Sequence, residues 1–391
     1  MDAAEGAMAR GGMKAFEDSD TQGEAVVDAG TVPALLRVLQ EEDPESEAVA
    51  LAAEALFTVA KECEAGFEVG EMVMPALVRV LRQAHPESVA VAKAAEALGE
   101  IAYTSEAARD QAMDAGALPA LMRVMREADP QSKSVAESTF AVTNIAITEE
   151  SGARADALAA AGVVPLLIRV LKAADVGSST AEYAVGALRN IAAASKESAE
   201  AVVAARAVPE LARVLQKADP ASEVVSNAAQ TFGNIANHSD ALREAVAEPE
   251  AGVVPALMRM LREIRAGSSS AADVVFALGN ISSGSDERAR AAAPAVPSLV
   301  QLLEGADPGS ELEQYAAYVI GNIAYSSDSL AEEVAAAGAV QALARVLNRA
   351  KPDSETAAFA AEALRCIADG SDELANVVAA TGALPEPKWR Q

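Results

Sequence analysis

The most informative polar residues of the chain are asparagines that recur at regular intervals. Five of them follow one another at steps of 42 to 46 residues: Asn144, Asn190, Asn234, Asn280 and Asn322. Asparagine is a poor choice for a helix interior unless its side chain has a partner. Its amide offers donors and an acceptor, which suits the backbone of an extended peptide. The series therefore predicts a ladder of amides that binds a peptide.

Aromatic side chains accompany the asparagines, although aromatic residues make up only 3% of the chain. With each asparagine as offset zero, the offsets −7, −4, 0 and +3 lie within an arc of about 80° on a helix. The aromatic residues at −7 and −4 are Phe140, Tyr183, Phe276, Tyr315 and Tyr318. We expect them to form apolar pockets for partner side chains. The alternative is structural, with aromatic rings covering the helix junctions and asparagines capping loops.

Carboxylates occupy the same stripe near the two ends of the series. They are Glu54, Glu96, Glu100 and Glu362, and Glu100 itself stands where an asparagine would be. Because carboxylates attract cations, these residues predict sites for Lys or Arg of a partner.

Motifs that carry catalysis are missing from the sequence. It contains no GxxxxGK[ST] loop and no HExxH, CxxC or GxSxG motif. The two cysteines, Cys63 and Cys366, lie too far apart to suggest a disulfide framework. We therefore expect no catalytic residue, no metal site and no cofactor.

Three further residue series indicate the elements that must position the stripe. Proline stands at 33, 75, 119, 165, 209, 255 and 297, with Gln341 in the eighth place. Serine follows each of these positions after thirteen residues, at 46, 88, 132, 178, 222, 268, 310 and 354. Twelve residues later comes what we call the signature position: Thr58, Glu100, the five asparagines and Cys366.

Each repeat reads as three helices. Proline is favoured in the first turn of a helix. Serine is favoured as the N-cap of the next helix. The glycine shortly before the next proline favours a left-handed helix end. Most repeats also carry arginine four residues after the proline position, which we expect to pair with local carboxylates. Such a unit cannot bury its apolar face alone, so the repeats must stack into a solenoid with a concave surface.

Composition supports an all-α fold and limits the partners. The 391 residues are 51% hydrophobic, with many alanines and few residues typical of strands. There are 58 acidic and 31 basic residues, and a net charge of −27 argues against nucleic acid and favours a basic partner. With no membrane-length apolar run and an acidic N-terminus, we expect neither membrane insertion nor secretion, and a cytoplasmic location, with a nuclear one possible.

The segments AGALPALMRVM and AGVVPLLIRVL, and Gly-Asn-Ile-Ala at 233–236 and 321–324, resemble armadillo repeats. The resemblance implies a right-handed superhelical solenoid of about eight repeats over residues 12–384, between an N-terminal tail at 1–11 and a C-terminal tail at 385–391. In the similar importin-α and β-catenin, an asparagine ladder binds extended peptides. The chain lacks the tryptophan array and the basic N-terminal segment of importin-α.

The sequence thus predicts a non-enzymatic adaptor that binds an extended, basic peptide segment of a partner protein in its groove. The alternative is a scaffold subunit of a larger assembly that uses its convex surface or its ends. Homo-oligomer formation is left open.

Overall fold

The structure, a computed structural model, describes residues 31–62, 66–147 and 152–384. The chain divides into two compact units, residues 1–194 and 195–391. Within the described ranges all regular elements are helices, as the composition predicts. The predicted tails, residues 1–11 and 385–391, lie outside these ranges, so the predicted domain boundaries stay predictions.

The first unit contains ten helices in its described part. They are α2 (Thr31–Glu41), α3 (Glu47–Glu62), α4 (Gly66–Gln83), α5 (Val89–Thr104), α6 (Glu106–Asp114), α7 (Ala117–Glu127), α8 (Lys133–Ile145), α9 (Ala153–Ala160), α10 (Val163–Ala173) and α11 (Ser179–Ala194). The long helices that carry the signature positions are α3, α5, α8 and α11, and each packs against the next.

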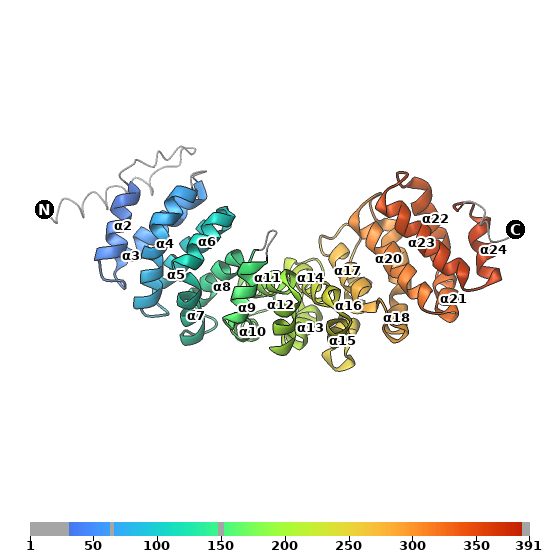
Figure 1. Cartoon of the computed structure of the whole chain (residues 1–391), viewed down its shortest axis with the longest axis horizontal. Helices are drawn as coiled ribbons and strands as arrows, with labels where there is room; N and C mark the ends of the chain where they lie inside the picture. The colour runs from blue at the N-terminus through green and yellow to red at the C-terminus, as the bar shows by residue number, and fades with distance from the viewer. Residues whose placement is uncertain (1–30, 63–65, 148–151, 385–391) are drawn as a thin grey trace. The chain divides into compact units, whose positions relative to one another are not determined.

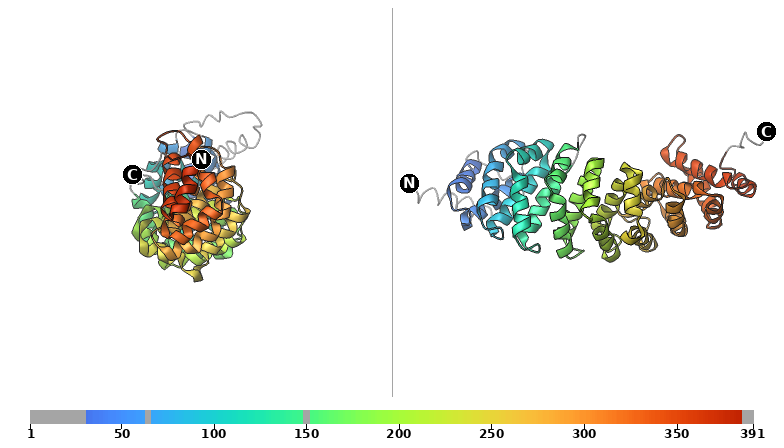
Figure 2. Two further views of the ribbon diagram at one scale, coloured as in Figure 1. Left: turned by 90° about the vertical axis from the view of Figure 1, so that its right-hand side faces the viewer. Right: turned by 60° about the horizontal axis from the view of Figure 1, so that its bottom comes forward.

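The second unit repeats the same pattern. Its helices are α12 (Lys196–Ala204), α13 (Ala207–Lys217), α14 (Glu223–His238), α15 (Asp240–Ala247), α16 (Val253–Glu263), α17 (Ala271–Ser282), α18 (Asp286–Ala292), α19 (Val296–Gly305), α20 (Glu311–Ser326), α21 (Asp328–Ala336), α22 (Ala339–Arg349), α23 (Glu355–Asp369) and α24 (Asp372–Ala380), with 3₁₀ turns η1 (Pro249–Ala251) and η2 (Ala293–Ala295). The long helices here are α14, α17, α20 and α23, again neighbours in order. The right-hand view of Figure 2 shows the helices of each unit layered side by side.

Helix ends follow the predicted chemistry in most repeats. The hydroxyl of Ser88 accepts a hydrogen bond from the amide of Val91 at the start of α5, and several other series serines cap their helices in the same way. Gly116, which precedes α7, has a φ of 79°, a backbone conformation that favours glycine because it lacks a Cβ atom.

Three positions differ from these expectations. Pro75 lies well inside α4, because the short helix and the proline helix of that repeat are continuous. The Ser222 hydroxyl donates to the carbonyl of Asp219 instead of capping α14. Ser268 lies in the turn before α17, which begins only at Ala271. None of these differences moves a long helix out of its place in the stack.

The core between the helices consists of small and branched aliphatic residues. In α5, Ala94, Ala95, Leu98 and Ile101 are completely buried. Alanine lets neighbouring helices approach closely, so tight packing replaces the aromatic bulk that the composition lacks. None of the helices that the structure describes combines the length and the apolar character needed to cross a membrane.

Candidate peptide-binding face of the long helices

The signature asparagines link neighbouring long helices. Asn144 donates from Nδ2 to the carbonyl of Gly99 at 2.9 Å. Asn280 does the same to Gly233 at 3.2 Å. Asn190 reaches the carbonyl of Thr143 at 3.2 Å. In all three cases the acceptor is the residue just before the signature position of the preceding repeat. One amide N–H of each side chain therefore holds two repeats together.

The side-chain amides of the other two asparagines, Asn234 and Asn322, do not bind the part of the preceding repeat that the structure describes. Asn322 lies on α20, and its Nδ2 atom is buried without a hydrogen-bond partner among the described residues. Asn234 on α14 is half-buried, and its side-chain amide makes no hydrogen bond to a described residue. Asn144 and Asn190, by contrast, are only 6% and 8% exposed. The five amides hold equivalent positions in the sequence, but they differ in which hydrogen-bonding atoms remain available to a ligand.

A glycine before the signature position makes room for the aromatic ring of the next repeat. A Cβ atom built on Gly99 would lie 2.6 Å from the ring of Phe140, and one on Gly233 would lie 2.4 Å from the ring of Phe276. Distances this short are not tolerated between real atoms, so the rings lie directly on the glycine backbones. Glycine just before the signature position therefore has two roles, since its backbone contacts the aromatic ring of the next repeat and its carbonyl accepts the amide hydrogen bond.

The aromatic residues of the stripe pair across repeats. The ring at offset −4 of one long helix contacts the ring at offset −7 of the next. Phe140 and Tyr183 have their centroids 5.1 Å apart, and Phe276 and Tyr315 have theirs 5.3 Å apart. Tyr318 pairs with Phe359 at 5.6 Å in an edge-on arrangement. All five aromatic residues that the sequence singled out take part in such pairs. Each pair leaves its rings half-buried at the surface.

Polar residues take the same −4 and −7 positions elsewhere. Lys93 binds Glu54 at 2.6 Å and also Glu96, three residues along its own helix, at 3.1 Å. In the second unit, Gln230 donates to Asp273 at 2.9 Å. The pairing of offset −4 with offset −7 in the next repeat thus recurs within each unit, although Glu96 and Glu137 at these offsets repel each other. Neither Lys93 nor Asp273 was singled out by the sequence, although the offsets that place them were known.

The electrostatics of the first unit are set by excess carboxylates. Burial raises the pKa of Tyr183, and the carboxylates of Glu137, Glu182, Glu96 and Glu100 raise it further. Burial also raises the pKa of Glu137, and the charge of Glu96 raises it further, whereas the charges of Lys133 and Lys93 partly offset the rise. Several carboxylates therefore surround the Phe140–Tyr183 pair.

The second unit has a similar arrangement around Tyr315. Burial raises the pKa of this phenol, followed by the charges of Glu311, Asp273 and Glu355. Glu362, predicted as a cation site, is exposed and pairs with Arg365 at 3.0 Å.

The signature residue Cys366 has a thiol that is hard to ionise. Burial raises its pKa, and the nearby Glu362 and Asp369 raise it further. Over residues 31–62, 66–147 and 152–384, no three His, Cys, Asp or Glu side chains gather in a way that could hold a metal ion.

Members of the arginine series pair with local carboxylates as predicted, as Arg123, Arg213 and Arg259 do. The series also binds backbone carbonyls of the preceding repeat, which the sequence did not predict. Arg123 on α7 donates to the carbonyl of Leu81 at 2.7 Å and to that of Ala84 at 2.8 Å. These are carbonyls at the end of the preceding proline helix that lack a partner within that helix. Arg79, Arg169 and Arg259 bind the preceding repeat in the same way, at Leu39, Ala128 and Leu215. The sequence could not predict these backbone contacts, because the carbonyls become neighbours of the arginines only when repeats stack.

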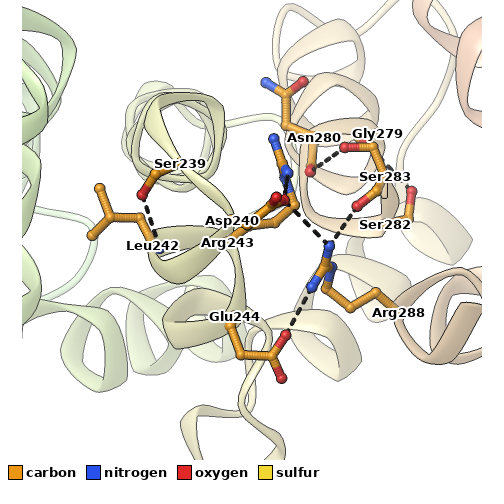
Figure 3. A network of polar contacts seen from close by, with 10 residues as sticks. All are labelled: Ser239, Asp240, Leu242, Arg243, Glu244, Gly279, Asn280, Ser282, Ser283 and Arg288. Atoms are coloured by element: carbon orange, nitrogen blue, oxygen red, sulfur yellow. Dashed lines mark hydrogen bonds and ion pairs between the residues drawn. The ribbon is translucent and has the colours of Figure 1, made fainter. Parts of the chain in front are cut away.

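A second set of arginines binds the ends of the long helices (Figure 3). Arg288 on α18 is buried and donates to the carbonyl of Ser283 and to the carboxylate of Glu244, both at 2.7 Å. Glu244 lies on α15 in the preceding repeat, so the guanidinium connects two repeats on the side of the short helices. Arg154 on α9 makes the matching contacts to Ile147 and Asp110.

Within each unit, repeated three-helix layers share one core and present one face of long helices. This arrangement defines an α-helical solenoid. A family model described as Armadillo/beta-catenin-like repeat matches residues 154–193, which include Asn190. A search of curated proteins finds no match.

Solved structures extend this similarity over the rest of the chain. An engineered protein is 29% identical with a TM-score of 0.83, and the match covers 97% of this chain and 89% of the other. A second engineered protein is 31% identical with a TM-score of 0.57, over 65% of this chain and 98% of the other. A designed armadillo repeat protein in complex with the peptide (KR)4 is 26% identical with a TM-score of 0.55, over 64% and 99%. The chain belongs to the armadillo-repeat family.

Proposed function

We propose that the face of the long helices binds an extended, basic peptide segment of a partner protein. In this proposal the signature asparagines bind the peptide backbone. The aromatic pairs provide surfaces for the stems of partner side chains, and carboxylates of the stripe bind their cationic ends. The protein then acts as a non-enzymatic adaptor.

The observation that carries the proposal is the electrostatic environment of the Phe140–Tyr183 pair. Four carboxylates are close enough to raise the pKa of the Tyr183 phenol. A lysine or arginine stem can lie on such rings while its charge is balanced by the surrounding carboxylates. A net charge of −27 would further attract a basic segment over longer distances. The (KR)4 peptide of the designed armadillo protein has this chemistry and supports the same ligand class.

The asparagines contribute unequally under this proposal. Asn144 already uses Nδ2 to bind the neighbouring repeat, so its Oδ1 is the atom that a peptide N–H would reach. The Nδ2 atom of Asn322 makes no internal hydrogen bond. If this amide turns toward a bound peptide and donates to its carbonyl, no existing hydrogen bond is broken. Asn322 is therefore the best position at which to separate binding from stability.

A labelled (KR)4 peptide tests the proposal by fluorescence anisotropy, with (DE)4 as the charge-reversed control. We expect the chain to bind (KR)4 but not (DE)4, with affinity that falls as salt rises. Asn322→Ala should weaken binding by about two- to tenfold, the worth of one hydrogen bond, and leave thermal stability unchanged. Asn144→Ala serves as the structural control, since it should also lower stability. Equal binding of both peptides, or binding that Asn322→Ala does not change, would contradict the ladder.

A scaffold subunit is the second candidate, and the internal hydrogen bonds of Asn144, Asn190 and Asn280 favour it. Those bonds give the asparagines a structural reason to exist without any ligand. In that case (KR)4 would not bind with measurable affinity, and a protein partner would contact the convex surface or the ends.

A further inference from the structure

Lys93 places an ammonium group on the face of the long helices. Its Nζ atom lies 2.6 Å from Oε1 of Glu54 on α3 and 3.1 Å from Oε2 of Glu96 on its own helix, α5. Burial by itself would lower the pKa of Lys93, but the hydrogen bonds and charges of the two glutamates raise it. Lys93 is therefore charged at neutral pH and joins two consecutive repeats.

The position of Lys93 within the stripe is distinctive. Among the residues at offsets −7 and −4 in all eight repeats, it is the one cation, whereas several are carboxylates or aromatic rings. The two glutamates that it binds were both predicted from sequence as sites for a partner's cation. An ammonium group bound between two carboxylates is the same contact that a lysine of a basic peptide would make there.

We infer that Lys93 is an internal occupant of this cation subsite and excludes the partner's cations from Glu54 and Glu96. The inference rests on the proposed function. Partner cations are thereby confined to the carboxylates beyond Lys93, namely Glu100, Glu137 and Glu182 around Tyr183. Lys93 thus determines where along the first unit a basic segment can be held. It is therefore a specificity-determining residue.

A purely structural ion pair predicts a different response to mutation. Glu54 is 48% exposed, and pairs of this kind contribute little to stability. Replacing Lys93 by methionine retains the apolar stem and removes only the charge, so the fold should persist. If the pair only joins the repeats, its removal should not create a new binding contact for a peptide. If Lys93 is an occupant, its removal should free two carboxylates.

The test measures (KR)4 binding to the full chain by anisotropy at low and at physiological salt. Lys93→Met should bind about three- to tenfold more tightly than wild type at low salt, with a smaller gain at higher salt. Lys196→Met is the matched control, because it removes the same charge from an exposed pair with Glu200 on the short helix α12. Its change in affinity measures the general effect of one charge. The double variant Glu54→Gln/Lys93→Met should lose most of the gain.

Each outcome separates this inference from the proposed function. If wild type binds and Lys93→Met binds equally or more weakly, the inference is overturned while the proposed function stands. A gain no larger than that of Lys196→Met also overturns it. If only Lys93→Met binds, Lys93 is an occupant, but the native chain does not bind basic peptides through this face. If neither protein binds, both ideas fail. Circular dichroism of each variant verifies that the helices are retained.

Discussion

The contact between Gly233 and the ring of Phe276 allows a sharp test of how the repeats stack. Gly233→Ala adds a methyl group 2.4 Å and 2.6 Å from two ring carbons, whereas the nearest other atom, Cα of Ala277, is 3.5 Å away. In a helix interior, alanine is favoured over glycine by about 1 kcal/mol. Overpacking a filled site typically costs about 1–3 kcal/mol. We expect a net loss of about 1 kcal/mol in local stability.

Removing the ring of Phe276 should reverse the sign of the stability change caused by Gly233→Ala. In a Phe276→Ala background, the added methyl group meets no ring, so Gly233→Ala should stabilise by up to about 1 kcal/mol. The coupling energy between the two sites is then about 2 kcal/mol, within the range found for residues in direct contact. Gly279→Ala provides a graded comparison, because its closest contacts are longer, at 3.0 Å and 3.1 Å. It should therefore cost less than Gly233→Ala.

Hydrogen exchange read by mass spectrometry over α14 and α17 suits this test, because a repeat protein opens locally and a global transition would average over many repeats. Four proteins complete the cycle: wild type, the two single variants and the double variant. The reasoning is refuted if Gly233→Ala has the same effect with and without the ring, or if it already stabilises the wild-type chain.

Three further predictions address charge, reactivity and the arginine series. Burial and Glu96 raise the pKa of Glu137, so the folded state favours its protonated form and ionisation costs stability at neutral pH. Glu137→Gln should raise the melting temperature at pH 7, and the gain should vanish below the unfolded-state pKa of about 4.3, as thermal melts across pH will show. The raised pKa of Cys366 predicts a slow reaction of its thiol with a maleimide. In a Cys63→Ser background at pH 7, this thiol should react more slowly than a free thiol in solution. An equal rate would contradict the buried environment of Cys366. Arg123→Met removes the guanidinium that binds the carbonyls of Leu81 and Ala84, and should lower the free energy of unfolding in urea by about 2 kcal/mol. Arg123→Lys should not restore this stability, because an ammonium group lacks the planar fork of a guanidinium.

Much of the candidate face follows from the one-dimensional pattern. The offsets −7, −4 and 0 lie on the long helices as predicted. Offset +3 passes the helix end at Ile147 and Ser283, whereas Tyr103 and Tyr325 at this offset lie on their helices and are strongly exposed. A helix has a fixed angle per residue, so spacing alone places residues on one face. The pattern could not show that Lys93 already binds two of the predicted cation sites. Nor could it show that the arginines reach carbonyls of the preceding repeat.

The sequence by itself determined the all-helical repeat, its three helices, most of its caps and the residues that share the face of the long helices. These features depend on neighbours within a few turns of the same helix or on residues that recur in every repeat. Only the tertiary structure decided which ring rests on which glycine, which asparagine amide has an internal partner and which carboxylates Lys93 binds. Most of these partners are about 40 residues apart, as with Asn144 and Gly99 or Lys93 and Glu54. They meet because of the offset and angle at which one repeat packs on the next, and close packing of small side chains sets that geometry.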